Sequence, residues 1–316
     1  MTELCIFILT YNRPHYLKEC LESIEAQSYN DFKVIVLDNA SQFNCKQIIN
    51  KFTNLNISYI RHSKNIGSTG NFMYAWSMNI DTPYTMIFHD DDIMHPELLK
   101  ICLSTLKEYK NLAWVGTSFN TIKSKNFASK FENNKCEVFS QYYLANYLMR
   151  SGSLCFSSVV YKTSKLKAIN LKQYISLYSI VFDRPLLLEL SMDGGCAICN
   201  GQLVSYRVHP EQDSVTGPLK FKNILALITC YKKIILNEDS NSDINYYKKW
   251  ASVSLAQSSI NLTMRNQESI YKYLKKASLQ LEIGLFEITI DTIKIIIKIP
   301  FRYIKRKLLV LLKENN

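Results

Sequence analysis

Three consecutive carboxylates follow a strand-like run in this sequence. Residues 84–88 are mostly apolar, Asp90, Asp91 and Asp92 come one residue later, and Pro96 opens a helix signal. Neighbouring carboxylates repel one another unless positive charge lies between them, and oxygen donors suit Mg²⁺ or Mn²⁺ better than zinc. Ligands of open α/β sheets bind where strands end, so the triplet predicts a metal site. The alternative is an acidic turn that is solvated or caps the next helix.

A strand-helix-strand unit must position this cluster. Residues 4–9 and 32–37 are strand-like, with helical spacing between them. The second strand ends at Asp38, whose carboxylate could accept hydrogen bonds from a nucleoside or cap a helix around 47–51. The glycine fingerprint of dinucleotide sites and the Gly-Lys-Ser/Thr phosphate loop are both missing, which argues against a dehydrogenase or a P-loop nucleotidase.

A glycine-containing loop follows the third predicted strand, residues 57–60. Residues 61–71 hold two glycines, three small hydroxyls and two cations ahead of a helix, which indicates a weakly specific diphosphate cradle. Later in the chain, Asp183 ends an apolar run at a predicted strand-to-helix junction. It is a candidate general base, with a plain helix N-cap as the alternative. Residues 154–161 and 203–208 also have strand patterns, whereas 118–135 indicates an exposed excursion.

The composition is that of a packed globular protein with a basic surplus. Hydrophobic residues make up 47% of the chain, and 38 Lys and Arg against 27 Asp and Glu give +11. This charge favours a polyanionic partner. Nine cysteines, an odd number without a recognisable secretory leader, favour reduced thiols in the cytosol. Cys196 and Cys199 have CxxC spacing, but no matching second pair accompanies them, so two core thiols are favoured over zinc.

The last hundred residues, from 218, have almost entirely helical patterns. In 291–316, seven Lys and Arg against two acids give +5, and the cations recur beside a broad apolar face. This pattern is typical of a helix in an anionic membrane surface, and equally of a helix folded back on the protein. Nucleic acid is disfavoured because no aromatic residues alternate with the cations. No apolar run approaches the ~18 residues that cross a bilayer.

Several stretches, taken in order, resemble glycosyltransferase family 2. They are Thr-Tyr-Asn-Arg-Pro at 10–14, Asp-Asn-Ala-Ser at 38–41, Asn65 with Gly67 and Asn71, and the triplet running into 93–97. The resemblance covers roughly residues 3–215. It implies the α/β GT-A fold, with a Rossmann-like, mostly parallel central sheet and flanking helices. The expected domains are 1–217, with a nucleotide-sugar half of about 1–117 and an acceptor half of about 118–217, and a helical region at 218–316.

The resemblance also implies roles for individual residues. Asp183 is the expected catalytic base, and the nucleotide-sugar donor is expected to contact Thr10, Tyr11, Asn12, Arg13, Asp38, Asn39, Asn65, Gly67, Asn71, Asp90 and Arg207. A Mn²⁺ or Mg²⁺ ion is expected on the DxD-type motif, and its ligands are taken from Asp90, Asp91, Asp92 and His209. Members often have Asp-x-Asp-Asp where this chain has His89-Asp90-Asp91-Asp92, so Asp91 is favoured as the main ligand. Phe182 replaces the Glu that usually precedes the base.

The implied function is inverting transfer of a sugar from a nucleotide sugar, a UDP-sugar by preference, to a hydroxyl of a glycan or lipid-linked glycan. Such a reaction belongs to the assembly of bacterial polysaccharide, O-antigen or capsule. The tail would hold the enzyme at the inner face of the cytoplasmic membrane. The alternatives are a catalytically silent nucleotide-sugar-binding protein, for which Phe182 is the hint, and a sugar-nucleotide pyrophosphorylase, which needs a glycine- and arginine-rich loop that is missing after the first strand.

Overall fold

The chain forms two compact units. The computed structural model describes residues 2–122, 135–150, 154–209, 220–237, 241–266 and 270–298. The first unit comprises 1–176 and 182–217, and the second comprises 177–181 and 218–316. The helical unit therefore begins after residue 217 and also includes a short earlier segment, 177–181.

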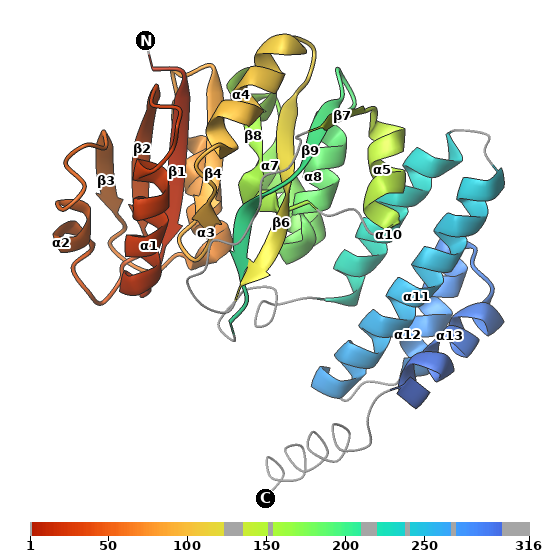
Figure 1. Ribbon diagram of the computed structural model, residues 1–316. Helices are drawn as coiled ribbons and strands as arrows, with labels where there is room; N and C mark the ends of the chain where they lie inside the picture. Colours follow the sequence, from red (N-terminus) through yellow and green to blue (C-terminus); the bar gives the residue numbers. More distant parts are fainter. Residues whose placement is uncertain are drawn as a thin grey trace, which may run out of the picture. The chain divides into compact units, whose positions relative to one another are not determined.

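The first half of the first unit is a parallel sheet with crossover helices (Figure 1). Its four strands have the order β3-β2-β1-β4, and every neighbouring pair is parallel. The elements are β1 (Leu4–Thr10), α1 (Pro14–Glu25), β2 (Phe32–Asp38), α2 (Cys45–Ile49), β3 (Ile57–Arg61), α3 (Gly67–Ser77) and β4 (Tyr84–His89). The strands predicted from the apolar runs are confirmed. Strands β1, β2 and β4 are largely buried, whereas β3, at the edge of the sheet, is half-buried to exposed.

The second half of the sheet is mixed in direction. The order continues from β4 through β8-β6-β9-β5, with β7 pairing β9 off this path. The strands are β5 (Ile93–Met94), β6 (Trp114–Ile122), β7 (Cys136–Phe139), β8 (Val160–Lys162) and β9 (Cys196–Arg207). Strands β6 and β9 are parallel, whereas β8, β5 and β7 run antiparallel to their neighbours. Residues 118–122, expected in an exposed excursion, instead extend β6 because β9 pairs with them.

Two other expected elements differ from the structure. The strand expected at 154–161 is a 3-10 turn, η1 (Phe156–Ser158), followed by β8. The hydroxyl of Ser158 donates to the Cys155 carbonyl at 2.7 Å, a local bond that competes with strand pairing. The apolar run before Asp183 forms α7 (Leu171–Tyr178) and η2 (Ser179–Val181) rather than a strand. Asp183 therefore lies at a junction between helical segments.

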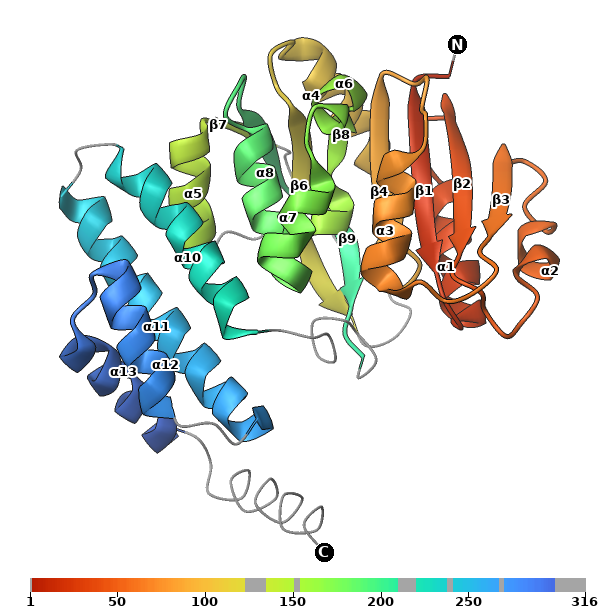
Figure 2. The ribbon, with the colours of Figure 1, turned by 180° about the vertical axis from the view of Figure 1, so that it is seen from behind.

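Helices cover both faces of the sheet. Helices α1 and α4 (Leu98–Glu108) lie on one face, and α3, α7 and α8 (Asp183–Leu190) lie on the other (Figure 2). Leu17, Leu21 and Ile24 recur at helical spacing along α1 and are fully buried in one apolar cluster with Ile6 and Ile8 of β1. Burial of each such side chain stabilises the fold by about 1.5–3 kcal/mol. This core fixes the strands whose ends carry the polar residues. The smaller helices are α5 (Gln141–Met149) and α6 (Thr163–Lys167).

One pair of cysteines is oxidised. Cys136 of β7 and Cys199 of β9 are opposite one another in the antiparallel ladder and form a disulfide. The expectation that Cys199 is a free core thiol is therefore wrong. Its partner stands 63 residues earlier in the sequence, where no spacing rule connects the two. Cys196 remains a buried thiol, as expected.

The second unit is helical as far as the structure describes it. Its helices are α10 (Phe221–Leu236), α11 (Asn241–Asn266), α12 (Ile270–Leu281) and α13 (Leu285–Lys298). Asp291 of α13 is buried and accepts hydrogen bonds from Lys249 at 2.5 Å and Ser252 at 2.7 Å. Among the described residues, no helix combines the length and the apolar character that a membrane crossing requires. Most of the predicted amphipathic tail, residues 299–316, lies outside the described residues.

Candidate active site

The ends of three parallel strands bring the predicted polar residues to one edge of the sheet. Strand β1 lies between β2 and β4, and the register pairs Thr10 with Asp38 and Leu9 with His89. The acidic triplet follows directly after His89. The structure therefore brings together residues that are up to about eighty positions apart in the sequence.

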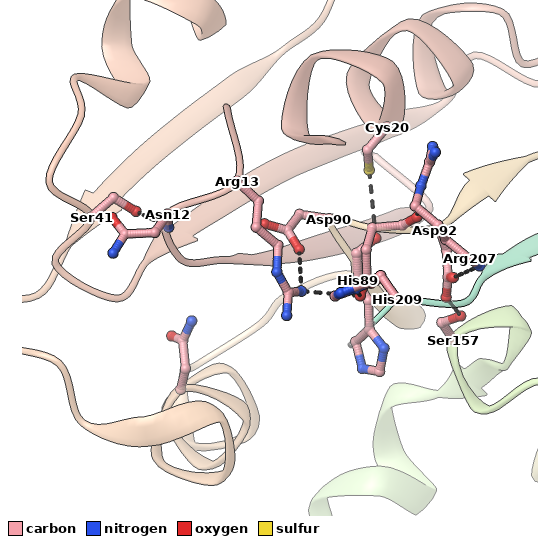
Figure 3. A network of polar contacts seen from close by, with 12 residues as sticks. Asn12, Arg13, Cys20, Ser41, His89, Asp90, Asp92, Ser157, Arg207 and His209 are labelled. Carbon is pink, nitrogen blue, oxygen red and sulfur yellow. Dashed lines mark hydrogen bonds and ion pairs between the residues drawn. The ribbon is translucent and has the colours of Figure 1, made fainter. Parts of the chain in front are cut away.

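The triplet is buried and ion-paired. Asp90 is 1% exposed and Asp91 7%. One guanidinium nitrogen of Arg13, Nη1, lies 3.2 Å from Asp90 Oδ1 and 3.0 Å from Asp91 Oδ2 (Figure 3). His209 Nε2 lies 2.9 Å from the same Asp91 oxygen. Arg13 and His209, expected to contact the donor and a metal, thus both contact the triplet.

Asp92 holds the neighbouring elements in place. Its Oδ2 accepts a hydrogen bond from the Ser157 hydroxyl at 2.6 Å, and its Oδ1 accepts one from the backbone N–H of Arg207 at 3.1 Å. The turn η1 and the end of β9 are therefore both fixed to the triplet. Ser157 carried no signal in the sequence, because a serine in an apolar run has many possible roles.

Arg207 lies beneath the triplet. Its side chain is 3% exposed, and its Nε donates to the Asp91 carbonyl at 2.9 Å. The guanidinium also pairs with Glu19 at 2.5 Å and lies 4.4 Å from the centre of the Tyr16 ring. These contacts fix the Arg207 side chain and stabilise the backbone of the acidic turn. Tyr16 and Glu19 of α1 were not predicted, since their helical spacing resembles that of ordinary surface residues.

The pKa values of the three carboxylates shift in different directions. Burial, followed by the charge of Asp91, raises the pKa of Asp90 to about 7 and that of Asp92 to about 8. Burial also acts to raise the pKa of Asp91, but His89, Arg13 and His209 outweigh it and lower that pKa. Three negative charges cannot be held together here without more positive charge than these side chains supply. A divalent cation would supply it.

The donor atoms fit such a cation. One ligand atom each from His89, Asp91 and Asp92 lies within 4.8 Å of the others. Within the described part of the chain, Asp91 Oδ1 has no hydrogen-bond partner, and Asp90 Oδ2 is buried without one. This group differs from the expected ligand set of Asp90, Asp91, Asp92 and His209. It adds His89, whereas Asp90 pairs with Arg13 and His209 hydrogen-bonds to Asp91. The position of His89 in the Asp-x-Asp-Asp pattern was the signal for it.

Asp38 is satisfied by its own neighbours. It is fully buried, and its carboxylate accepts hydrogen bonds from the Tyr59 hydroxyl at 2.6 Å and the Ser41 N–H at 2.8 Å. Arg61 Nη1 lies 3.8 Å away. Burial acts to raise the pKa of Asp38, but these hydrogen bonds outweigh it and lower the pKa. The carboxylate caps the turn after β2, whereas the N-cap of α2 is Asn44.

The loop after β1 is tied to the loop after β2. The N–H of Asn12 donates to Ser41 Oγ at 2.9 Å, and Asn12 Oδ1 accepts from the Gln42 N–H at 2.7 Å. Asn12 has a φ of 54°, a left-handed conformation that asparagine tolerates better than most residues. Tyr11 keeps 39% of its surface exposed, whereas Thr10 is buried. Tyr11 thus presents an exposed ring at this edge of the sheet.

The predicted phosphate loop is held by asparagine side chains. Asn39 donates to Asn65 Oδ1 at 2.9 Å and accepts from the Ile66 N–H at 2.8 Å. Asn65 Oδ1 also accepts from the Gly67 N–H at 2.8 Å, and buried Asn71 donates to a backbone carbonyl of β2 at 3.0 Å. Gly67 has a φ of 78°, so its backbone conformation requires glycine, although a Cβ would meet no atom there. These residues shape the loop that begins α3.

Asp183 shares a neighbour with the triplet. It begins α8, and burial raises its pKa while the nearby charge of His89 acts to lower it. His89 acts in the same direction on the pKa of Asp91, so its charge influences both carboxylates. Phe182 packs into an aromatic cluster with Phe72, 5.0 Å between ring centres, and Phe156, 5.9 Å. Its substitution for Glu thus replaces a charge with core packing.

The comparisons with known proteins agree with this arrangement. The Glycosyl transferase family 2 profile matches residues 5–168, more than half of the chain. The chain belongs to glycosyl transferase family 2. It is a glycosyltransferase with the GT-A fold, and the predictions of family, fold and enzyme class are confirmed.

The relatives of this family 2 glycosyltransferase include two bacterial proteins and one solved structure. It is 24% identical over 294 residues to abequosyltransferase RfbV of Salmonella typhimurium, covering 85% of this chain and 82% of that one. It is 26% identical over 180 residues to a teichoic acid poly(glycerol phosphate) polymerase of Staphylococcus epidermidis, covering 24% of that polymerase. The structure of S. aureus TarS 1-349 in complex with UDP-GlcNAc is similar in fold, with a TM-score of 0.62, 14% identity, and coverage of 92% of this chain and 88% of TarS.

Proposed function

We propose that this protein is a metal-dependent inverting glycosyltransferase that moves a sugar from a nucleotide sugar to a hydroxyl of a glycan or lipid-linked glycan. The observation that carries the proposal is the cluster of His89, Asp91 and Asp92 at the end of β4. The charge of the same histidine acts on the pKa of Asp183. The similarity to RfbV supports bacterial surface polysaccharide as the product class. A UDP-sugar is the first donor to test, because the TarS structure contains UDP-GlcNAc.

The residues divide the work of the reaction. Asp91, with Asp92 and a third donor, would hold Mn²⁺ or Mg²⁺, which when bound supplies positive charge against the departing diphosphate. Asp183 accepts the proton of the acceptor hydroxyl, whose oxygen attacks the anomeric carbon on the side opposite the diphosphate. Configuration inverts, so an α-linked donor gives a β-glycoside. The raised pKa of Asp183 suits a base that works near neutral pH.

The donor contacts follow from exposure. Tyr11 presents an accessible ring for the base, and the loop that begins α3 presents backbone N–H groups near a helix N-terminus, which favour phosphate. Asn39, Asn65 and Asn71 shape this loop from within. Asp38 and Arg207 support the site rather than bind the donor directly.

The direct test is a screen of nucleotide sugars for thermal stabilisation with Mn²⁺, followed by transfer assays with those that bind. A true donor stabilises the folded protein by mass action. Hydrolysis or transfer that is lost in EDTA and restored by Mn²⁺ supports the proposal. Donor binding without turnover under any condition would instead indicate a silent binding protein, the alternative to which Phe182 points. With the family established, no residue favours the pyrophosphorylase alternative.

The membrane partner is a separate part of the proposal. Phe286 and Ile293, one heptad apart on α13, are 77% and 50% exposed, and the basic sequence continues after them. Both support attachment of the C-terminal region to an anionic membrane surface. Deletion of 299–316 tests this more cleanly than deletion from 291, because Asp291 is buried against Lys249 and Ser252. Unchanged sedimentation with vesicles containing anionic lipid would rule out the tail as the anchor.

A further inference from the structure

His89 has an unusual combination of neighbours. It is the last residue of β4 and is half-buried, and its backbone carbonyl faces the Cys20 thiol at 3.7 Å. Its imidazole makes no hydrogen bond within the described part of the chain, although it lies within 4.8 Å of donor atoms of Asp91 and Asp92. A partly buried imidazole commonly has a hydrogen-bond partner that fixes its ring. This one has both nitrogens available.

We infer that His89 is itself a ligand of the divalent ion, so that one nitrogen and the oxygens of Asp91 and Asp92 hold the ion. The inference rests on the proposed metal-dependent function and goes further by naming the third ligand and the class of metal. The site should therefore prefer Mn²⁺ and later first-row ions over Mg²⁺.

The preference follows from ligand chemistry. Mg²⁺ is small, dehydrates reluctantly and is bound through oxygen, usually keeping several waters. Imidazole nitrogen suits first-row transition ions, whose affinity for a given nitrogen and oxygen site rises along the series from Mn²⁺. Replacing one carboxylate by imidazole also removes a negative charge, which weakens the purely electrostatic attraction on which Mg²⁺ depends. Both effects disfavour Mg²⁺.

The other nearby histidine is differently employed. His209 Nε2 already lies 2.9 Å from Asp91 Oδ2, a position from which it orients the carboxylate. The opposite oxygen of Asp91, Oδ1, accepts no hydrogen bond from any residue that the structure describes. Asp91 can therefore bind an ion through Oδ1 while His209 and Arg13 remain on Oδ2. His209 thus provides a matched control for His89.

The test is pulsed electron paramagnetic resonance of Mn²⁺ bound to the full-length protein, in which a ligating imidazole produces ¹⁴N modulation of the echo. We expect modulation in the wild type and in H209Q but not in H89Q. Mn²⁺ affinity, from titration of the free-ion signal, should fall at least about tenfold in H89Q, since even residues that only orient a ligand contribute 10–100-fold. The ratio of Mn²⁺ to Mg²⁺ affinity should fall at least tenfold in H89D, which restores a carboxylate.

The outcomes separate this inference from the proposed function. Bound Mn²⁺ without ¹⁴N modulation, modulation that survives in H89Q, or modulation lost only in H209Q overturns the role of His89, even if sugar transfer is found. Modulation that depends on His89 without transfer from any nucleotide sugar overturns the proposed function and leaves the ligand in place. Absence of Mn²⁺ binding overturns both. Circular dichroism of each variant confirms that loss of binding is not loss of folding.

Discussion

Two strand ends in the same sheet hold buried carboxylates in opposite electrostatic states. Asp38 ends β2, and the triplet follows β4, with β1 between them. Asp38 is fully buried and Asp92 is 1% exposed, so exposure does not distinguish them. Yet the pKa of Asp38 is lowered, whereas that of Asp92 is raised to about 8. Burial is the largest influence on both, and it acts in the same direction.

The number of partners per carboxylate explains the difference. Asp38 is a single charge that receives two hydrogen bonds and a neighbouring guanidinium. The three charges of the triplet share one arginine and nearby histidines, and Asp91 takes most of that stabilisation. A satisfied carboxylate supports the fold, whereas an under-compensated cluster favours binding a cation. The comparison therefore separates an internally satisfied acid from the acids of the proposed metal site at one edge of one sheet.

The largest effect is expected from D91N, which removes the charge and keeps the side-chain volume. Loss of the main metal ligand should lower kcat/KM at least about a thousandfold, or about 4 kcal/mol. Steady-state transfer at saturating Mn²⁺ measures it. The matched control is D31N, an exposed carboxylate before β2, which should leave kcat/KM unchanged. Near-wild-type turnover in D91N would contradict a role for Asp91 as the main metal ligand.

D183N should lower kcat/KM at least about a hundredfold, a typical contribution of general-base catalysis. The base must be ionised, and burial raises its pKa, so activity should rise with pH through a limb above the ordinary carboxyl range. A pH profile of kcat/KM measures this limb. This limb should disappear in D183N. If D183N keeps the same limb, the general base is another group.

D38N should destabilise the fold by about 2 kcal/mol at pH 7, because the Tyr59 hydroxyl loses a charged acceptor in a buried place. Urea denaturation measures it. Because the folded-state pKa is lowered, this stabilisation is present above the unfolded-state pKa and is lost as pH falls through the folded-state value. The gap between D38N and wild type should therefore narrow in acid. Y59F, which removes the same hydrogen bond from the other side, should cost about 1 kcal/mol.

D92N should behave oppositely in metal-free protein, with the smallest effect. A raised folded-state pKa gives stability that is present below the unfolded-state pKa and lost as pH rises through about 8. In EDTA, wild type should therefore lose stability relative to D92N as the pH rises from 6 to 8, and the difference should level off above pH 8. Parallel curves for the two proteins would show that Asp92 is as well compensated as Asp38.

Local pattern predicted the strands and their ends, but not the partners of the polar residues. The apolar runs that form β1, β2, β3 and β4 are continuous and flanked by helical spacing, so they could be placed from the sequence. The pairing of Arg13 with the triplet joins residues 77 and 78 positions apart, and the contact of Arg207 with Glu19 spans 188. Such contacts depend on strand order, which periodicity does not encode.

The second half of the first unit was predicted less well for a related reason. Strands β8 and β5 are three and two residues long, too short for alternation to be recognised. The apolar residues before Asp183 form α7 and η2, although a short apolar run fits a strand equally well. Asp183 could nevertheless be singled out, because an acid beginning a helix signal does not depend on the preceding element.

Residues 177–181 connect the helical unit in sequence with the candidate base. They belong to that unit, where the Asn223 side chain donates to the Leu177 carbonyl at 2.8 Å, and they end one residue before Phe182. The chain thus leaves the sheet-containing unit and returns to it immediately before its candidate base. Excision of everything after 217 would strip this five-residue detour of its packing partners. Loss of activity in such a shortened enzyme would then have two explanations. Asp183 could be displaced, or a membrane anchor could be missing.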